Sequence, residues 1–259
     1  MDALARAAAR VRRLAAGYEP PGFAHVPGPD AAIFLCAVDH STGYRESHRV
    51  DGRGPFSGSE LMWELGLRGR PLRAGELAHV TGAEVADWFR ADHETVADPE
   101  RRAALWRKLA VALQRECGGS AATLLESSGG RLAGPSGLMA RLARFEAYSD
   151  PLEKKSFLFA KICERRGWLE VADPESWEVS ADNVLMRLAL RSGLVADGPL
   201  DEVRAATRSA LKELAQGSGL STPVLDDLLW ELGRDDPNLL GNDAGDLHEP
   251  PRDPDSTWY

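Results

Sequence analysis

Apolar residues recur at every third or fourth position along most of this chain, which is the spacing of amphipathic α-helices. The clearest case is the segment 97–117, where Leu105, Leu109 and Leu113 share one face. The same spacing predicts further helices over residues 2–16, about 135–145, 153–166, 181–192, 199–216 and 222–233. Strict alternation of apolar and polar residues, which marks half-buried strands, is almost absent. The pattern therefore predicts an all-α fold.

Several predicted helix ends carry local signals. Asp98 followed by Pro99 is a typical helix N-terminus. Ser57 and Glu60 have the spacing of a capping box, in which each side chain accepts from the backbone of the other residue. The apolar run at 31–38 is short enough to be a helix or a strand by its pattern alone.

Composition shifts divide the chain into three predicted parts. Residues 1–30 hold a first helix and a Pro/Gly-rich connection, 31–234 form the main helical domain, and 235–259 are an acidic, proline-rich tail. We expect the tail to be irregular or disordered. The formal net charge is −9, of which −5 falls between Arg234 and Tyr259. The body is thus only mildly acidic, and a local basic face stays open.

Composition bounds the class of protein further. Of the 259 residues, 43% are hydrophobic and 27% are charged, as in ordinary soluble globular domains. No apolar run is long enough to span a membrane. The Ala/Arg-rich start reads as an amphipathic helix or as a transit peptide. Three distant cysteines form no C-x-x-C pair, which argues against a zinc site, an iron–sulfur cluster or a disulfide framework and favours reduced thiols in a cytoplasmic protein.

Three motifs in the second half of the chain resemble the helix-hairpin-helix DNA glycosylase superfamily. S-A-D-N-V-L-M-R-L-A-L-R-S-G-L-V resembles its catalytic-aspartate helix, and E-K-K-S-F-L-F-A-K-I resembles its lysine helix. P-V-L-D-D-L-L-W-E-L-G resembles a late helix shared by archaeal 8-oxoguanine DNA glycosylases and queuosine salvage proteins, which are queuosine 5′-phosphate N-glycosylases. G-S-E-L-M-W-E-L-G-L-R-G-R-P-L-R, in the middle of the chain, is closer to the salvage branch.

The resemblance covers roughly residues 30–235 and carries expectations for fold and function. It implies a DNA-glycosylase-like multi-helix bundle with a central pocket, and cleavage of a base–sugar bond. The L-P-G-V-G hairpin that grips a DNA phosphate in that superfamily has no counterpart before Lys155. Its absence favours a nucleoside or nucleotide over duplex DNA as the substrate.

Asp182 is the predicted catalytic residue. Breaking a base–sugar bond builds positive charge on the sugar, which a nearby carboxylate stabilises while it orients water. Burial among Leu185, Leu188 and Leu190 would strengthen that effect. The alternative is an ordinary N-cap aspartate. Lys155 could hold a phosphate, could attack the sugar as a Schiff-base nucleophile, or could be a solvated lysine beside Lys154.

A nucleobase pocket needs aromatic faces and a few polar groups. Trp63 and Trp230 lie in the motifs shared with the salvage branch, and Asp226 stands one turn before Trp230. Asp39 and His40 form a polar pair at the end of the apolar run at 31–38. We predict these residues to bind substrate. The competing interpretations are core packing for the tryptophans, a solvent-facing Asp226, and a capping or surface His40.

Three functional hypotheses follow. The first is an N-glycosidase acting on a modified nucleoside or its 5′-phosphate, with no metal, cofactor or membrane partner. The second is an 8-oxoguanine-type DNA glycosylase/lyase, which would bind DNA. The third is a non-catalytic helical binding protein, because a fold can be kept without its activity.

Overall fold

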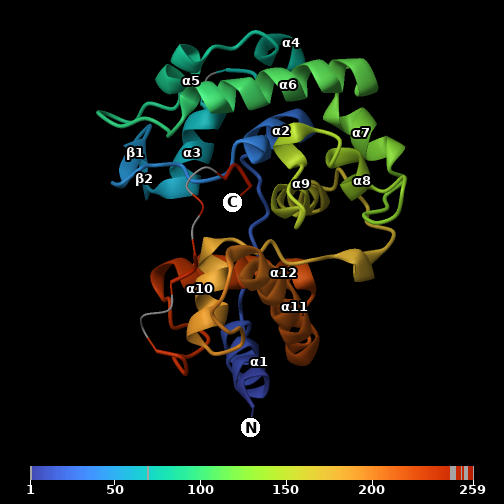
Figure 1. The fold of residues 1–259 in the computed structure, drawn as a ribbon. Helices are drawn as coiled ribbons and strands as arrows, with labels where there is room; N and C mark the ends of the chain where they lie inside the picture. The colour runs from blue at the N-terminus through green and yellow to red at the C-terminus, as the bar shows by residue number, and fades with distance from the viewer. Residues whose placement is uncertain (1, 69, 246–248, 252, 254–255, 259) are drawn as a thin grey trace. The chain divides into compact units, whose positions relative to one another are not determined.

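A computed structural model describes residues 2–68, 70–245, 249–251, 253 and 256–258 of the chain (Figure 1). Within these residues it contains twelve α-helices, two short 3-10 helices and one two-stranded sheet, which confirms the predicted all-α class. Contacts divide the chain into two compact units. Unit 1 comprises residues 1–22 and 175–254, and unit 2 comprises residues 23–174 and 255–259. No helix in the described part of the chain is long and apolar enough to cross a membrane.

Unit 1 joins the first helix of the chain to the last three (Figure 1). These are α1 (Ala3–Leu14), α10 (Asn183–Arg191), α11 (Leu200–Ser218) and α12 (Thr222–Asp235). α1 packs on α11, and α10 packs on both α11 and α12. The predicted apolar stripes meet in one core, whose members include Ala7, Val11, Leu185, Leu188, Leu211, Leu214, Leu225 and Leu229.

A glycine sets the close approach of α10 to α12. A Cβ atom on Gly233 would lie 2.6 Å from Leu188 Cδ1 and 3.2 Å from Val184 Cγ1. The guanidinium of Arg187 donates to the Gly233 carbonyl at 3.1 Å. The small residue on α12 therefore lets two side chains of α10 pack directly against its backbone.

Unit 2 is built around the apolar run whose type the pattern left open. This run is a helix, α2 (Pro29–Ala37), in which every residue from Ala31 to Ala37 is buried. It packs mainly against α9 (Lys154–Arg165) and also contacts α6 (Pro99–Cys117). The indole N–H of Trp106 donates to the Phe34 carbonyl at 2.6 Å. Burial on all sides explains why the run shows no helical periodicity.

Shorter helices surround α2 and α6 in unit 2 (Figure 1). They are α3 (Gly58–Leu67), α4 (Ala74–Leu77), α5 (Gly82–Trp88), α7 (Ala121–Ser127) and α8 (Leu138–Leu142). The 3-10 helices are η1 (Glu146–Tyr148) and η2 (Pro174–Ser176), the second of which spans the boundary between the units. α4 and α5 pack along α6.

A β-hairpin was missed by the pattern analysis. β1 (His48–Val50) pairs antiparallel with β2 (Arg53–Phe56). Asp51 and Gly52 make the turn, with φ of 50° and 78°. The Asp-Gly pair is a recognised signal for such a tight hairpin turn. The strands are too short for alternation to stand out.

One helix-end prediction needs correction and another is confirmed. Ser57 precedes α3, but its side chain makes no capping hydrogen bond, so the predicted capping box with Glu60 is wrong. A capping box exists instead between Thr81 and Glu84 at the start of α5. Asp98 and Pro99 do begin α6, as predicted; Asp98 is the N-cap residue, with a left-handed φ of 48° and no capping bond from its side chain.

The described part of the predicted tail is irregular, and a few contacts anchor its first half to unit 1. No helix or strand occurs among its described residues after Asp235, as expected. However, Leu240 is buried in the core of unit 1, and the Ala244 amide donates to the Arg191 carbonyl at 3.0 Å. Arg6 also pairs with Asp243. Residues 246–248, 252, 254, 255 and 259 of the tail lie outside the described residues.

Candidate functional site

The seven predicted site residues fall into both units. Unit 2 holds Asp39, His40, Trp63 and Lys155, and unit 1 holds Asp182, Asp226 and Trp230. Within unit 2 the four residues form two hydrogen-bonded pairs, Asp39 with Trp63 and His40 with Lys155. Within unit 1 the two aspartates are linked through the short segment that leads into α10.

Lys155 is a fully buried amine on the second residue of α9. Its Nζ donates to the Ala37 carbonyl at 2.6 Å and lies 3.2 Å from His40 Nδ1. Burial, followed by the charge of Lys154, holds the pKa of Lys155 well below its usual range. Burial, followed by the charge of Lys155, likewise depresses the pKa of His40. The prediction of a solvated lysine is wrong, as is that of a surface histidine.

Buried cations gather at the C-terminal end of α2. Lys155 and Lys154 donate to the carbonyls of Ala37 and Asp39, the latter at 2.9 Å. Arg102 donates to the Ser41 carbonyl at 2.7 Å and also to those of Val38 and His40. The last carbonyls of a helix lack partners within the helix and carry partial negative charge. Lys155, on the Ala37 carbonyl, and Arg102, on the Val38 carbonyl, therefore cap α2, and the other bonds hold the segment that follows it. Lys155 thus has a structural role.

Arg102 is the principal residue of this cluster that sequence reasoning missed. Its guanidinium is buried, and burial lowers its pKa to about 10. The signal was present, because Arg102 falls on the apolar face of α6 together with Trp106 and Leu109. A charge within such a stripe must find buried partners.

Asp39 joins three elements of unit 2 through its carboxylate. Its Oδ1 accepts from the Ser59 hydroxyl at 2.5 Å, and its Oδ2 accepts from the Trp63 indole N–H at 3.3 Å. Lys154 Nζ lies 3.8 Å from Oδ2. Trp63 is 9% exposed and uses its polar edge within the fold. Core packing, the competing interpretation, fits this tryptophan.

Asp182 is the N-cap residue of α10 and is half-buried. Its Oδ1 accepts from the backbone amides of Val184 at 2.9 Å and Leu185 at 3.0 Å. Leu185 and Leu188 behind it are buried, as expected. These bonds fix the carboxylate at the positive end of a helix, which stabilises its ionised form. Asp182 thus has the N-cap role that was the competing interpretation of this residue.

Asp226 is buried, so the prediction of a solvent-facing residue is wrong. Its Oδ1 accepts from the Ser180 amide at 2.9 Å, two residues before Asp182. Trp230, one turn later on α12, is half-buried. The guanidinium of Arg234 lies 4.7 Å from the centroid of its ring, within the range of a cation–π contact.

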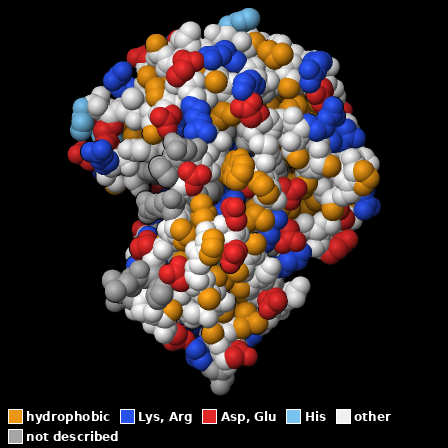
Figure 2. Space-filling model, viewed as in Figure 1, with side chains coloured by type: hydrophobic (Ala, Val, Ile, Leu, Met, Phe, Trp, Pro, Cys, Tyr) orange, Lys and Arg blue, Asp and Glu red, His pale blue; other side chains and the backbone are white. Residues whose placement is uncertain are grey.

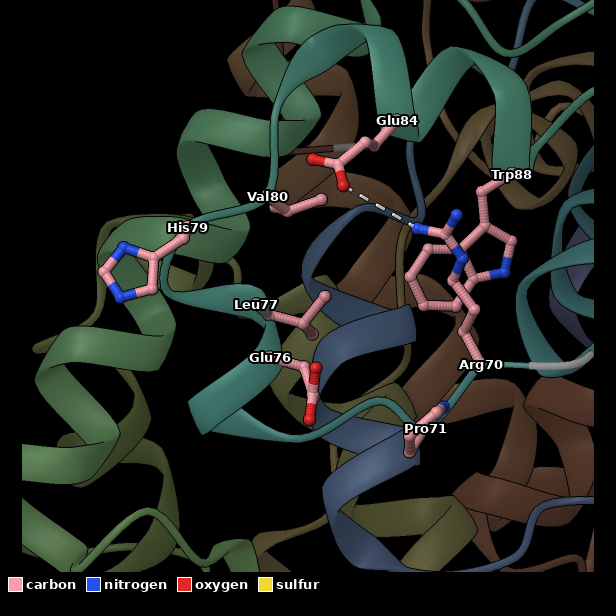
Figure 3. Close-up of a pocket in the computed structure, with 8 residues that line it drawn as sticks. All are labelled: Arg70, Pro71, Glu76, Leu77, His79, Val80, Glu84 and Trp88. Atoms are coloured by element: carbon pink, nitrogen blue, oxygen red, sulfur yellow. Dashed lines mark ion pairs between the residues drawn. The ribbon is translucent and has the colours of Figure 1, made fainter.

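A separate pocket of about 300 Å³ lies beside α4 and α5 (Figure 3). Its lining contains none of the predicted site residues. Figure 3 shows the Arg70 guanidinium over the Trp88 ring, 5.6 Å from the centroid, and its nitrogen is 3.9 Å from a Glu84 oxygen. Arg70 and Glu84 of this pocket therefore pair with one another, and the pocket does not belong to the predicted site.

Among the described residues, no group of three or more His, Cys, Asp or Glu side chains could hold a metal ion. Cys36, Cys117 and Cys163 are buried free thiols. Neither a scan against protein-family models nor a search of curated proteins finds a match to the chain.

Proposed function

We propose that the chain is an N-glycosidase that hydrolyses the base–ribose bond of a modified nucleoside or nucleoside 5′-phosphate. The observation that carries this proposal is the Asp182 carboxylate, held in one orientation by two backbone amides at the start of α10. A fixed carboxylate suits a reaction that develops positive charge, because no reorganisation is needed when the charge appears.

The chemistry requires one carboxylate and one water molecule. As the bond between the base nitrogen and C1′ breaks, its electron pair leaves with the base and C1′ becomes cationic. Asp182 stabilises that cation and orients the water, whose oxygen bonds to C1′. The proton released from the water is taken up by the departing base. The products are the free base and the sugar.

The resemblance in motif order favours a queuosine-type substrate. Along the chain, the lysine helix comes first, the aspartate helix second and the late helix last, which is the order expected of the salvage proteins. All three segments are helical here. Trp230 on α12 remains the proposed contact to the base. The other four predicted side chains bond to one another or to the backbone of unit 2, which favours a structural role for Asp39, His40, Trp63 and Lys155.

Product analysis by mass spectrometry tests the proposal. Wild type and Asp182→Asn would be incubated with queuosine, its 5′-monophosphate and a panel of ordinary and damaged nucleotides. We expect free base from wild type alone. Asn is about as good an N-cap as Asp, so unfolding in urea should shift by less than about 0.5 kcal/mol. Equal base release by the two proteins, with stability unchanged, would remove Asp182 from catalysis.

A DNA glycosylase/lyase is the second candidate because the pKa of Lys155 is lowered by burial. A deprotonated amine can attack C1′ while the base leaves with the electron pair of its bond to C1′, and opening of the sugar ring at C1′–O4′ then gives a Schiff base. However, Lys155 is 0% exposed. On the face of unit 2 seen in Figure 2, described basic and acidic side chains alternate, whereas DNA binding calls for a basic strip.

Borohydride trapping separates this candidate from hydrolysis. Wild type and Lys155→Gln would be incubated with a duplex containing 8-oxoguanine and then reduced. A covalent adduct formed by wild type alone would establish the lyase. If no base is released from the monomers or from this duplex, the results favour the hypothesis of a non-catalytic binding protein.

A further inference from the structure

The segment that carries Asp182 into α10 is held by α12. Asp226 is 4% exposed, and its Oδ1 accepts the Ser180 amide at 2.9 Å. Ser180 is itself buried, and the next amide, that of Ala181, donates to the Val179 carbonyl at 3.0 Å. The backbone is therefore fixed at both residues that immediately precede Asp182.

A second contact fixes α10 farther along its length. Arg187 donates to the Gly233 carbonyl at 3.1 Å, and Gly233 leaves room for Leu188 and Val184 against α12. Asp226 and Gly233 are seven residues apart, or about two turns of α12. α12 thus holds both the segment before Asp182 and the body of the helix that Asp182 caps.

We propose that Asp226 is a positioning residue that sets the location of the Asp182 carboxylate through the Ser180 amide. This inference rests on the proposed hydrolysis and changes the expected role of Asp226, which no longer needs to touch the base. Because Asp182 lies only two residues after Ser180, its carboxylate has little freedom to move once the Ser180 amide is bound to Asp226. Misplacement of a reacting group by about 1 Å can lower a rate by roughly 100-fold.

Two substitutions of Asp226 separate positioning from binding of the base. Asp226→Asn keeps the shape and an oxygen that can accept the Ser180 amide, so we expect its kcat to stay within a few-fold of wild type. Asp226→Ala removes the acceptor, so we expect kcat to fall by about 100-fold with KM nearly unchanged. If Asp226 instead held the base, both substitutions would raise KM, and Asp226→Asn would be as damaging as Asp226→Ala.

The experiment combines kinetics with hydrogen exchange in the full chain. Steady-state kinetics would use queuosine 5′-monophosphate with wild type, both variants and Glu231→Ala. Glu231 is a matched control because it is an exposed carboxylate on the same helix and bonds Tyr18 instead. Exchange of the Ser180 amide, which needs no activity, should be at least about 10-fold faster in Asp226→Ala and unchanged in the other two variants.

The outcomes distinguish the inference from the function on which it rests. A rise in KM at constant kcat, or unchanged exchange at Ser180 in Asp226→Ala, would overturn positioning while leaving hydrolysis in place. Wild type that releases no base from any nucleotide would overturn the hydrolysis, and the positioning role with it. A lower kcat together with faster exchange in Asp226→Ala alone is the expected result.

Discussion

Lys155 shows how one buried amine can serve the fold and still invite a catalytic interpretation. Its bonds to Ala37 and His40 tie α9 to the end of α2. Its lowered pKa follows from burial, which disfavours the charged form whether or not a substrate is present. A perturbed pKa marks a functional site only as a hypothesis, because structural clusters produce the same shift.

The lowered pKa of Lys155 predicts a pH dependence of stability. Between that lowered value and the ordinary 10.5, the unfolded chain binds a proton that the folded chain does not. The free energy of unfolding should therefore rise with pH across this window, by up to about 1.4 kcal/mol per pH unit from this group. Urea unfolding between pH 7.5 and 9.5 would measure it.

Lys155→Met isolates this contribution from other titrating groups. The variant should show a smaller increase of stability with pH than wild type, whatever its stability at pH 7.5. Lys108→Met is the control, since Lys108 lies on α6 and pairs at the surface with Glu146. Parallel pH curves for wild type and Lys155→Met would contradict a depressed pKa.

For single residues, the sequence predicted which side chains belong to a polar cluster better than it predicted the partners of those side chains. Asp39 and His40 were recognised as a polar pair beside an apolar helix, and the structure places them in one cluster with Lys155. Arg102 stood out by its place on the apolar face of α6, but its partners, like the partner of Ser59, lie far away in sequence and could not be named. Hydrogen bonds of that kind leave no periodic pattern.

At the scale of elements, a histidine fastens the β-hairpin of unit 2. His48 on β1 has its two ring nitrogens 3.0 Å from Asp92 Oδ2 and 3.0 Å from Glu94 Oε2. The bonds to Glu94 and then to Asp92 raise the pKa of His48. His93 and Glu46 lie nearby, 3.9 Å apart, and the His93 ring is 6.1 Å from that of His48.

Protonation of His48 should stabilise the hairpin. Because its folded pKa is raised above 6.5, the stabilisation is fully present below pH 6.5 and is lost as pH rises through the raised value. Amide protection in β1 and β2, corrected for intrinsic exchange, should therefore fall several-fold between pH 6 and pH 8.5. In His48→Gln the protection should be lower and nearly independent of pH, and an unchanged profile would contradict the assignment.

Packing between α10 and α12 predicts the effect of a single methyl group. Gly233→Ala places a Cβ 2.6 Å from Leu188 Cδ1, so the helices must separate or Leu188 must shift. We expect a loss of about 1–3 kcal/mol in the free energy of unfolding. Gly217→Ala on α11, whose nearest neighbour would be 3.7 Å away, should instead stabilise by about 0.5–1 kcal/mol. Urea unfolding of the two variants compares them directly.

Helices with one apolar face were predicted well, and elements without that face were not. α10, α11 and α12 lie within a few residues of their predicted bounds. α8 is shorter than the predicted 135–145, and the hairpin at 48–56 was not foreseen. Periodicity reports burial on one side of an element, so it fails for α2, which is buried all round, and for strands of three or four residues.

At the scale of the whole molecule, the chain forms two compact units, and unit 1 joins two long segments that are far apart in sequence. α1 contributes Ala7, Ala8 and Val11 to a core otherwise drawn from residues beyond 175. The sequence shows an amphipathic helix at 2–16, but a local pattern cannot say which partner covers it. The predicted domain boundaries remain a prediction.

A charge placed on α1 should therefore act on the distant end of the chain. Val11→Asp puts an unpaired carboxylate into the core of unit 1, where Val11 is 0% exposed. We expect hydrogen exchange to accelerate in α10–α12, while α2, α6 and α9 of unit 2 keep their protection. Arg13→Ala, an exposed change on the same helix, should leave both units unaffected. Loss of protection confined to unit 2 would contradict the division.

The discontinuity of unit 1 also sets an order of events during synthesis. Residues 23–174 of unit 2 leave the ribosome as one stretch, so most of that unit can complete its core early. α1 emerges before unit 2 but must wait for α11, which begins at Leu200. At 5–20 residues per second this delay is roughly 10–40 s. Throughout that time the apolar face of the first helix is a bare surface, available to a chaperone before it meets the rest of its own unit.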